Sequence, residues 1–90
     1  MKIDTKNLQR LLNTLEIELK KNGNGAENNI SALRLKLLAD ENEKNVINLL
    51  TILKSSAKIM ELADFTPKEE KLWLDVWAEA SRLLELNAKL

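Results

Sequence analysis

The stretch DFTPKEEKLW, at Asp64–Trp73, contains the clearest helix start in the chain. Thr66 is placed to cap a helix, and Pro67 suits the first helical position because its fixed φ is already helical. Glu69 follows Thr66 by three residues and completes a capping box, in which each residue bonds the other's backbone N–H. We therefore predict a helix over about 67–87.

Three more helices are expected before this one, because leucine and isoleucine recur there at spacings of three and four residues. Their predicted bounds are about 5–21, 26–39 and 41–63. Short connections between helices favour antiparallel neighbours. The sequence therefore predicts an all-α antiparallel four-helix bundle, formed as a single domain over residues 1–90.

The clearest break between helices is NGNGAENN, at Asn22–Asn29, which holds both glycines of the chain. Gly23 is expected to end the first helix, since glycine adopts positive φ without strain. Asp4 is expected to cap the start of the first helix. Asn24, with Glu27 three residues later, resembles a capping box for the second.

The boundary between the second and third helices is the least marked, because LLADENEKNV at Leu37–Val46 has no glycine or proline. Asp40 and Glu43 resemble another cap pair, which favours a turn at 40–41. The alternative is one continuous helix from Ala26 to Ala63. Such a helix could not fold back on itself, and it would require a partner chain.

Both tryptophans, Trp73 and Trp77, lie four residues apart on the last predicted helix. One interpretation is that both indoles fill the core of a chain that has few other aromatic residues. The other is that at least one lies in an interface, where tryptophan is enriched. The third and fourth helices are apolar over much of their circumference, which is typical of central helices or of helices that contact a second molecule.

Catalysis is not expected, because the chain has no histidine, cysteine or tyrosine. These residues supply the commonest general base, the best nucleophile and the phenolic acid. The acidic stretch DENEK at Asp40–Lys44 lacks the glycine and glutamate spacing of a calcium loop. GNG at Gly23–Gly25 lacks the lysine of a phosphate-binding loop. We expect no catalytic residues, no metal site and no cofactor.

Nucleic acid and membranes are disfavoured as partners, because the formal net charge is zero. No apolar run approaches the ~20 residues that a membrane span requires. The first ten residues, MKIDTKNLQR, lack the apolar region of a signal peptide. We expect a cytoplasmic protein.

These observations favour a non-enzymatic protein-binding module, such as a small accessory inhibitor, an immunity-type protein or a regulatory protein. It would act by burying an apolar face of the third and fourth helices on a partner. The predicted contact residues are apolar anchors and an acidic rim: Met60, Trp73, Leu74 and Trp77, with Glu70, Asp75 and Glu79.

Two other functions remain open. The first is a structural homodimer that uses the same helices and has no foreign partner. The second, less favoured, is a nucleic-acid-binding regulator that uses the more basic first half of the chain. Its candidate residues are Lys2, Lys6, Arg10, Lys20, Lys21, Arg34 and Lys36.

Overall fold

The computed structural model describes residues 3–39, 42–56 and 64–88. These residues form four helices and no strand, so the predicted all-α four-helix bundle is confirmed. The helices are α1 (Lys6–Asn22), α2 (Glu27–Ala39), α3 (Glu43–Ser55) and α5 (Pro67–Ala88).

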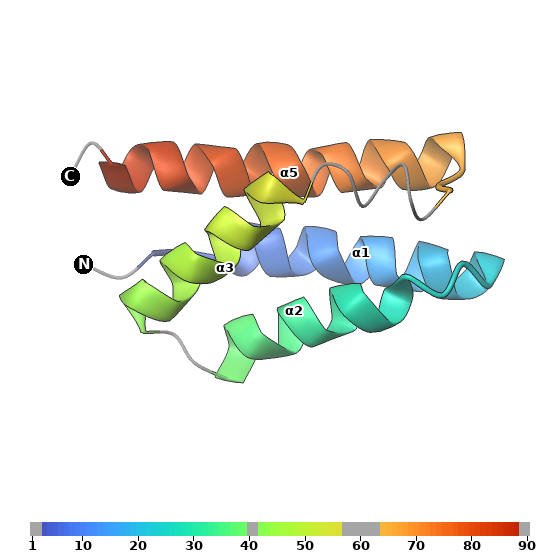
Figure 1. The fold of residues 1–90 in the computed structure, drawn as a ribbon, viewed down its shortest axis with the longest axis horizontal. Coiled ribbons are helices and arrows are strands. Elements are labelled where there is room, and N and C mark those ends of the chain that lie inside the picture. Colours follow the sequence, from blue (N-terminus) through green and yellow to red (C-terminus); the bar gives the residue numbers. More distant parts are fainter. Residues whose placement is uncertain (1–2, 40–41, 57–63, 89–90) are drawn as a thin grey trace.

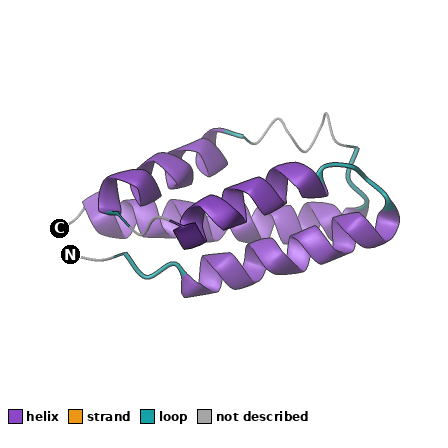
Figure 2. Ribbon diagram, turned by 90° about the horizontal axis from the view of Figure 1, so that it is seen from below, coloured by secondary structure: helices purple, strands orange, loops and turns teal. Residues whose placement is uncertain are grey.

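Consecutive helices run in opposite directions, as Figure 1 shows, so that both chain ends lie at the same end of the bundle. α1 packs along both α2 and α5, and α3 packs against α5. α3 crosses the bundle obliquely, and it contacts α2 much less than α5. Figure 2 shows α1 and α2 side by side in the foreground, with α5 behind them.

The core is built almost entirely from aliphatic side chains of all four helices, with one indole. α1 contributes a stripe at spacings of three and four residues, as an amphipathic helix should. The buried apolar residues are Leu8, Leu12, Leu15, Leu19, Ile30, Leu37, Val46, Leu49, Leu50, Leu53, Trp73, Val76, Ala80 and Leu83. α2 contributes only Ile30 and Leu37 to this set.

The end of α1 follows the prediction made for Gly23, which has φ +67°. Its N–H donates to the Lys20 carbonyl at 3.2 Å, and the Asn24 N–H donates to the Leu19 carbonyl at 3.1 Å. This pair of bonds is a Schellman motif. At the other end, the Asp4 carboxylate accepts the Lys6 N–H at 3.1 Å, and the helix begins at Lys6.

The start of α2 differs slightly from the predicted capping box. The Asn24 side-chain oxygen accepts the Ala26 N–H at 3.1 Å, and the Glu27 carboxylate accepts the Gly25 N–H at 2.7 Å. Each side chain therefore bonds a loop N–H rather than its counterpart's, and the helix begins at Glu27, one residue later than predicted.

α2 and α3 are separate helices, so the alternative of one continuous helix is wrong. Asn42 has an extended backbone (φ −57°, ψ 131°), and its side chain accepts the Lys44 N–H at 2.9 Å. It caps α3, the role predicted for Asp40. The predicted turn residues 40–41 lie outside the described residues.

α3 is shorter than the predicted helix over 41–63, because it ends at Ser55. The Ser56 hydroxyl donates to the Ile52 carbonyl, and the Ser56 N–H donates to the Leu53 carbonyl at 3.3 Å. These local bonds satisfy carbonyls that a longer helix would use, which is how serine commonly competes with helix continuation. The remaining part of that prediction, residues 57–63, lies outside the described part of the chain.

The predicted capping box at the start of α5 is confirmed. The Thr66 N–H donates to Glu69 Oε1 at 2.8 Å, and the Glu69 N–H donates to Thr66 Oγ1 at 3.2 Å. Glu69 is only 1% exposed. Its second oxygen, Oε2, accepts the Asn22 side-chain amide at 3.1 Å, which links the start of α5 to the end of α1.

Glu69→Ala should lower the free energy of unfolding by about 2–3 kcal/mol, because it removes the acceptors of the Thr66 N–H and the Asn22 amide together with the packing of a buried side chain. Glu70→Ala, at an exposed site in the same helical turn, should cost only about 0.5 kcal/mol. Urea unfolding followed by circular dichroism measures both values. Equal losses of unfolding free energy in the two variants would show that the hydrogen bonds of Glu69 add no stability beyond that of an exposed glutamate in the same turn.

Candidate protein-binding surfaces

The two tryptophans have different environments. Trp73 is 1% exposed and lies in the core. Its expected role as a surface anchor is therefore wrong. Trp77 is half-buried, and its indole Nε1–H donates to the Lys54 carbonyl at 3.0 Å. This carbonyl belongs to the last turn of α3, where helix carbonyls lack intrahelical partners, so Trp77 ties α5 to the end of α3.

Glu79 is also buried, at 6% exposure, so its predicted place in an exposed acidic rim is wrong. Its carboxylate accepts two hydrogen bonds from Arg82, at 2.6 and 2.9 Å. It also accepts the Asn7 side-chain amide at 3.1 Å. The bond from Arg82 holds the Glu79 pKa below its usual value. Burial opposes this shift, while Asn7 and the charge of Arg10 add to it.

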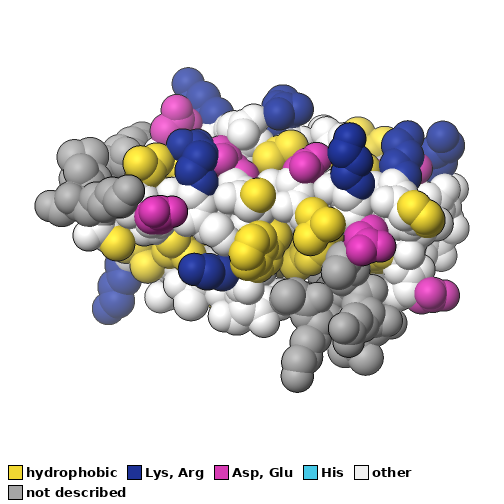
Figure 3. All heavy atoms as spheres, turned by 90° about the horizontal axis from the view of Figure 1, so that it is seen from above, with side chains coloured by type: hydrophobic (Ala, Val, Ile, Leu, Met, Phe, Trp, Pro, Cys, Tyr) yellow, Lys and Arg dark blue, Asp and Glu magenta, His cyan; other side chains and the backbone are white. Residues whose placement is uncertain are grey.

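The other predicted contact residues do not converge on one surface. Leu74 and Glu70 are exposed and lie four residues apart, on the side of α5 that also carries Trp77. Asp75 is exposed, and as the residue after Leu74 it lies on a different side of α5, the side that carries Glu79. Figure 3, which looks onto α5, shows hydrophobic side chains along the middle of this face and Lys and Arg along one edge. Met60 lies outside the described residues.

Among the described residues, the most exposed large apolar side chains lie on α1 and α2, which the sequence-based prediction did not select. Ile17 is 59% exposed, Leu35 is 54% exposed and Leu38 is 51% exposed. The signal for Leu35 and Leu38 was already in the sequence: α2 has leucines on all sides, and only one side of it is needed for the core.

An ion pair fixes the relation of Ile17 to Leu35. The Arg34 Nε donates to Glu16 Oε2 at 2.8 Å, so these residues face each other across α1 and α2. The next residue in each helix is turned by about 100°. In an antiparallel pair, these two rotations point the next side chains to the same side of the pair. Ile17 and Leu35 therefore both project into solvent, at about the same height along the helix axes.

We define the outer α1–α2 face as this surface. Residues three and four positions from Ile17 and Leu35 extend it along each helix. Its apolar members are Ile17, Ala32, Leu35, Leu38 and Ala39, and its polar members are Arg10, Asn13, Thr14, Lys20, Lys21 and Ser31. Apart from the half-buried Ser31, all of these residues are exposed.

The charges of α1 are separated by side. Both of its acids are used between helices: Glu16 pairs with Arg34, and Glu18 Oε2 lies 3.4 Å from the Lys68 amine. Its four cations are exposed. They belong to the residues proposed for the nucleic-acid alternative, namely Lys6, Arg10, Lys20 and Lys21. Of the remaining three, Arg34 is paired, Lys36 is exposed on α2, and Lys2 lies outside the described residues.

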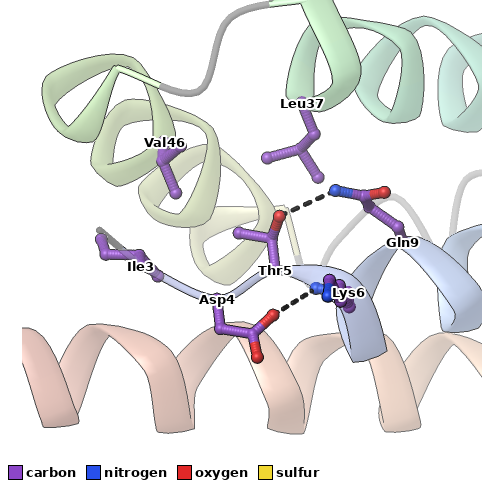
Figure 4. A pocket seen from close by; sticks show the side chains of 7 residues that line it. All are labelled: Ile3, Asp4, Thr5, Lys6, Gln9, Leu37 and Val46. Atoms are coloured by element: carbon purple, nitrogen blue, oxygen red, sulfur yellow. Dashed lines mark hydrogen bonds between the residues drawn. The ribbon is translucent and has the colours of Figure 1, made fainter.

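A pocket of about 280 Å³ lies where the N-terminal segment meets α2 and α3. Figure 4 shows Leu37 and Val46 pointing toward Thr5 across it. The Gln9 amide donates to the Thr5 hydroxyl at 2.9 Å, so these two polar groups bond each other. The pocket is lined by apolar and polar side chains in similar measure, and the polar groups of Asp4, Thr5 and Gln9 form bonds within the segment that carries them. It is therefore a weak candidate for a small-molecule site.

Within 3–39, 42–56 and 64–88, no cluster of three or more acidic side chains is placed to hold a metal ion. None of the helices in these ranges is long and apolar enough to cross a membrane. Comparisons with protein-family models, curated proteins and solved structures found no match to this chain. The function must therefore be inferred from the chain's own surfaces.

Single-tryptophan variants should separate the two environments. In Trp77→Phe, the remaining Trp73 should emit at short wavelength and resist quenching by acrylamide, because it is buried. In Trp73→Phe, the remaining Trp77 should emit at longer wavelength and be quenched several-fold more strongly. Fluorescence of the dilute protein measures both, and equal quenching of the two indoles would contradict the assignment.

The Glu79 contacts should make stability depend on pH. Because the folded-state pKa of Glu79 is below its unfolded value of about 4.3, its carboxylate stabilises the fold fully above that value. The contribution is lost as the pH falls through the folded-state pKa. The free energy of unfolding, measured with urea, should therefore fall less steeply from about pH 6 to pH 3 for Glu79→Gln than for the natural chain. Parallel pH profiles would refute the role given to Glu79.

Proposed function

We propose that this chain is a non-enzymatic protein-binding module, acting as a small inhibitor, immunity-type or regulatory protein would. It would bury an apolar helical surface on another protein and so block or stabilise one state of it. The observation that carries the proposal is the outer α1–α2 face, where Ile17, Leu35 and Leu38 are each more than half exposed.

Among the described residues, the large apolar side chains of this surface take no part in the core. The buried cluster is formed by other side chains of all four helices, including Trp73. Leu35 and Leu38 contribute nothing to that buried set, although α2 carries them at helical spacing. Adjacent exposed leucines of this kind on a small protein commonly mark an interaction site.

The energy available supports a contact of ordinary strength. Burying a whole leucine or isoleucine side chain is worth about 1.5–3 kcal/mol, so covering three half-exposed ones provides about 2–4 kcal/mol. Association also costs translational and side-chain entropy. The apolar group would therefore act as the centre of an interface whose polar border, supplied by α1, adds specificity.

The surface first expected on the third and fourth helices is reduced to a smaller candidate. Leu74 and Glu70 are exposed beside the half-buried Trp77. Trp77 already uses its N–H within the chain, on the Lys54 carbonyl. The α5 patch therefore offers one free apolar side chain, Leu74, whereas the outer α1–α2 face offers three.

The test is affinity capture from extracts of the source cells with matched variants. Leu35→Gln should reduce capture of the partner at least about tenfold. Ile52→Gln and Leu86→Gln alter apolar residues on α3 and α5 that are exposed to a similar extent, and these variants should capture the partner as the natural chain does. Glutamine keeps helix propensity close to that of leucine, so circular dichroism should be unchanged in all three.

The proposal fails if Leu35→Gln and the two control variants capture the same proteins in the same amounts. Loss of the partner in Leu86→Gln or Ile52→Gln alone would place the contact on α3 and α5. Light scattering of the dilute chain adds the homodimer alternative: a dimer that Leu35→Gln converts to a monomer would mean that the face binds a second copy.

A further inference from the structure

We infer that the outer α1–α2 face receives an acidic amphipathic helix of another protein. This inference rests on the proposed protein-binding function and specifies the chemistry of the partner. It follows from how charge and apolar groups are arranged on the face.

The basic side chains border the apolar ones on one side. Lys20 and Lys21 lie one turn after Ile17, and Arg10 lies two turns before it. Among the described residues, none of these three cations forms an ion pair. Arg10 donates a hydrogen bond to the Asn7 side chain at 2.8 Å, and its charge also acts on Glu79 of α5, although the two do not form an ion pair.

The apolar strip runs parallel to this basic strip, along α2. It consists of Ala32, Leu35, Leu38 and Ala39. Ala32 and Ala39 have small side chains, so another helix can approach α2 closely on either side of Leu35 and Leu38. From Arg10 to Lys21, α1 rises about 16 Å, the length of three helical turns. A partner helix of that length with leucines on one face and carboxylates along the adjoining edge would match both strips.

A second copy of this chain does not supply these groups. In a two-fold dimer the same patch is used twice. If two copies dock through the outer α1–α2 face, the cations of α1 meet either the same cations or the leucine strip of α2. Neither arrangement offers carboxylates to Arg10, Lys20 and Lys21, and like charges across an interface are unfavourable.

Nucleic acid and lipid fit the face less well than an acidic helix. Phosphate contacts would satisfy the cations, but a polar backbone gives Leu35 and Leu38 nothing to pack against. Helices that lie in a membrane surface usually carry Trp or Phe among their apolar residues. The three aromatic residues of the chain, Phe65, Trp73 and Trp77, all lie elsewhere, and Lys36 is the one cation on the far border of the strip.

The test uses a defined probe, a fluorescent helical peptide of about 20 residues with leucines on one face and glutamates along one edge. A control peptide carries lysine in place of each glutamate. Binding to the full chain is measured by fluorescence anisotropy at about 50 and 300 mM salt. The acidic peptide should bind, its affinity should fall with salt, and the lysine peptide should bind at least about tenfold more weakly.

Charge-reversal variants locate the site. Arg10→Glu/Lys20→Glu/Lys21→Glu should lower affinity for the acidic peptide at least about tenfold. The matched triple Lys44→Glu/Lys54→Glu/Lys71→Glu changes net charge equally at exposed sites on α3 and α5, and should change affinity less than about threefold. Leu35→Gln should weaken binding at all salt concentrations, because its contribution is apolar.

Three results would overturn the inference. The first is no peptide binding, or equal weakening by both charge-reversal triples. The second is binding of duplex DNA or of phosphatidylserine vesicles, with no binding of the acidic peptide. The third is capture of the cellular partner that survives Arg10→Glu/Lys20→Glu/Lys21→Glu but not Leu35→Gln. In that case the protein-binding function would stand and the acidic partner would not.

Discussion

The packing of α1 against α2, which brings Glu16 and Arg34 together, is the contact on which the candidate binding surface depends. Because the two helices are antiparallel, fixing these residues opposite each other sends Ile17 and Leu35 to the same side. A different register would disperse these apolar groups, and each would be an isolated exposed residue of the kind found on any protein surface. The pair also uses one of the two acids of α1, which leaves the solvent side of that helix basic.

α1 is tied to α5 near both of its ends, which leaves its remaining side free for solvent or a partner. Asn22 donates to buried Glu69, and Asn7 donates to buried Glu79. Buried carboxylates are costly unless every oxygen is satisfied. Glu69 is satisfied by the capping box and Glu79 by Arg82, so both also serve as fixed attachment points. α3 is held through Trp77, because the indole N–H donates to the Lys54 carbonyl in the last turn of α3. The two tryptophans thus have different structural roles: Trp73 fills the core, and Trp77 joins α5 to α3.

Helix number, order and most boundaries could be predicted from local signals, because the capping box at Thr66 and the positive φ of Gly23 are decided by neighbouring residues. The end of α3 at Ser55 could not, because no glycine or proline stands at this point of the sequence to mark it. Not every predicted contact residue proved to be exposed, because a wide apolar sector shows how much a helix can bury but not which part of it other helices cover. Trp73 is buried in the core, and Glu79 is bonded by Asn7 of α1 and by Arg82. That Ile17 and Leu35 project to the same side follows from how α1 and α2 pack on each other, which periodicity within one helix does not contain.

The most direct test of this account is methyl NMR of the dilute chain with a soluble paramagnetic gadolinium chelate, which broadens methyl signals that face water. We expect strong broadening at Ile17, Leu35 and Leu38, and little at Leu12, Ile30 and Leu37, which lie on the buried sides of the same two helices. If Ile17 and Leu35 were as protected as Leu12, α1 and α2 would not present a shared apolar surface, and the proposed binding face would not exist.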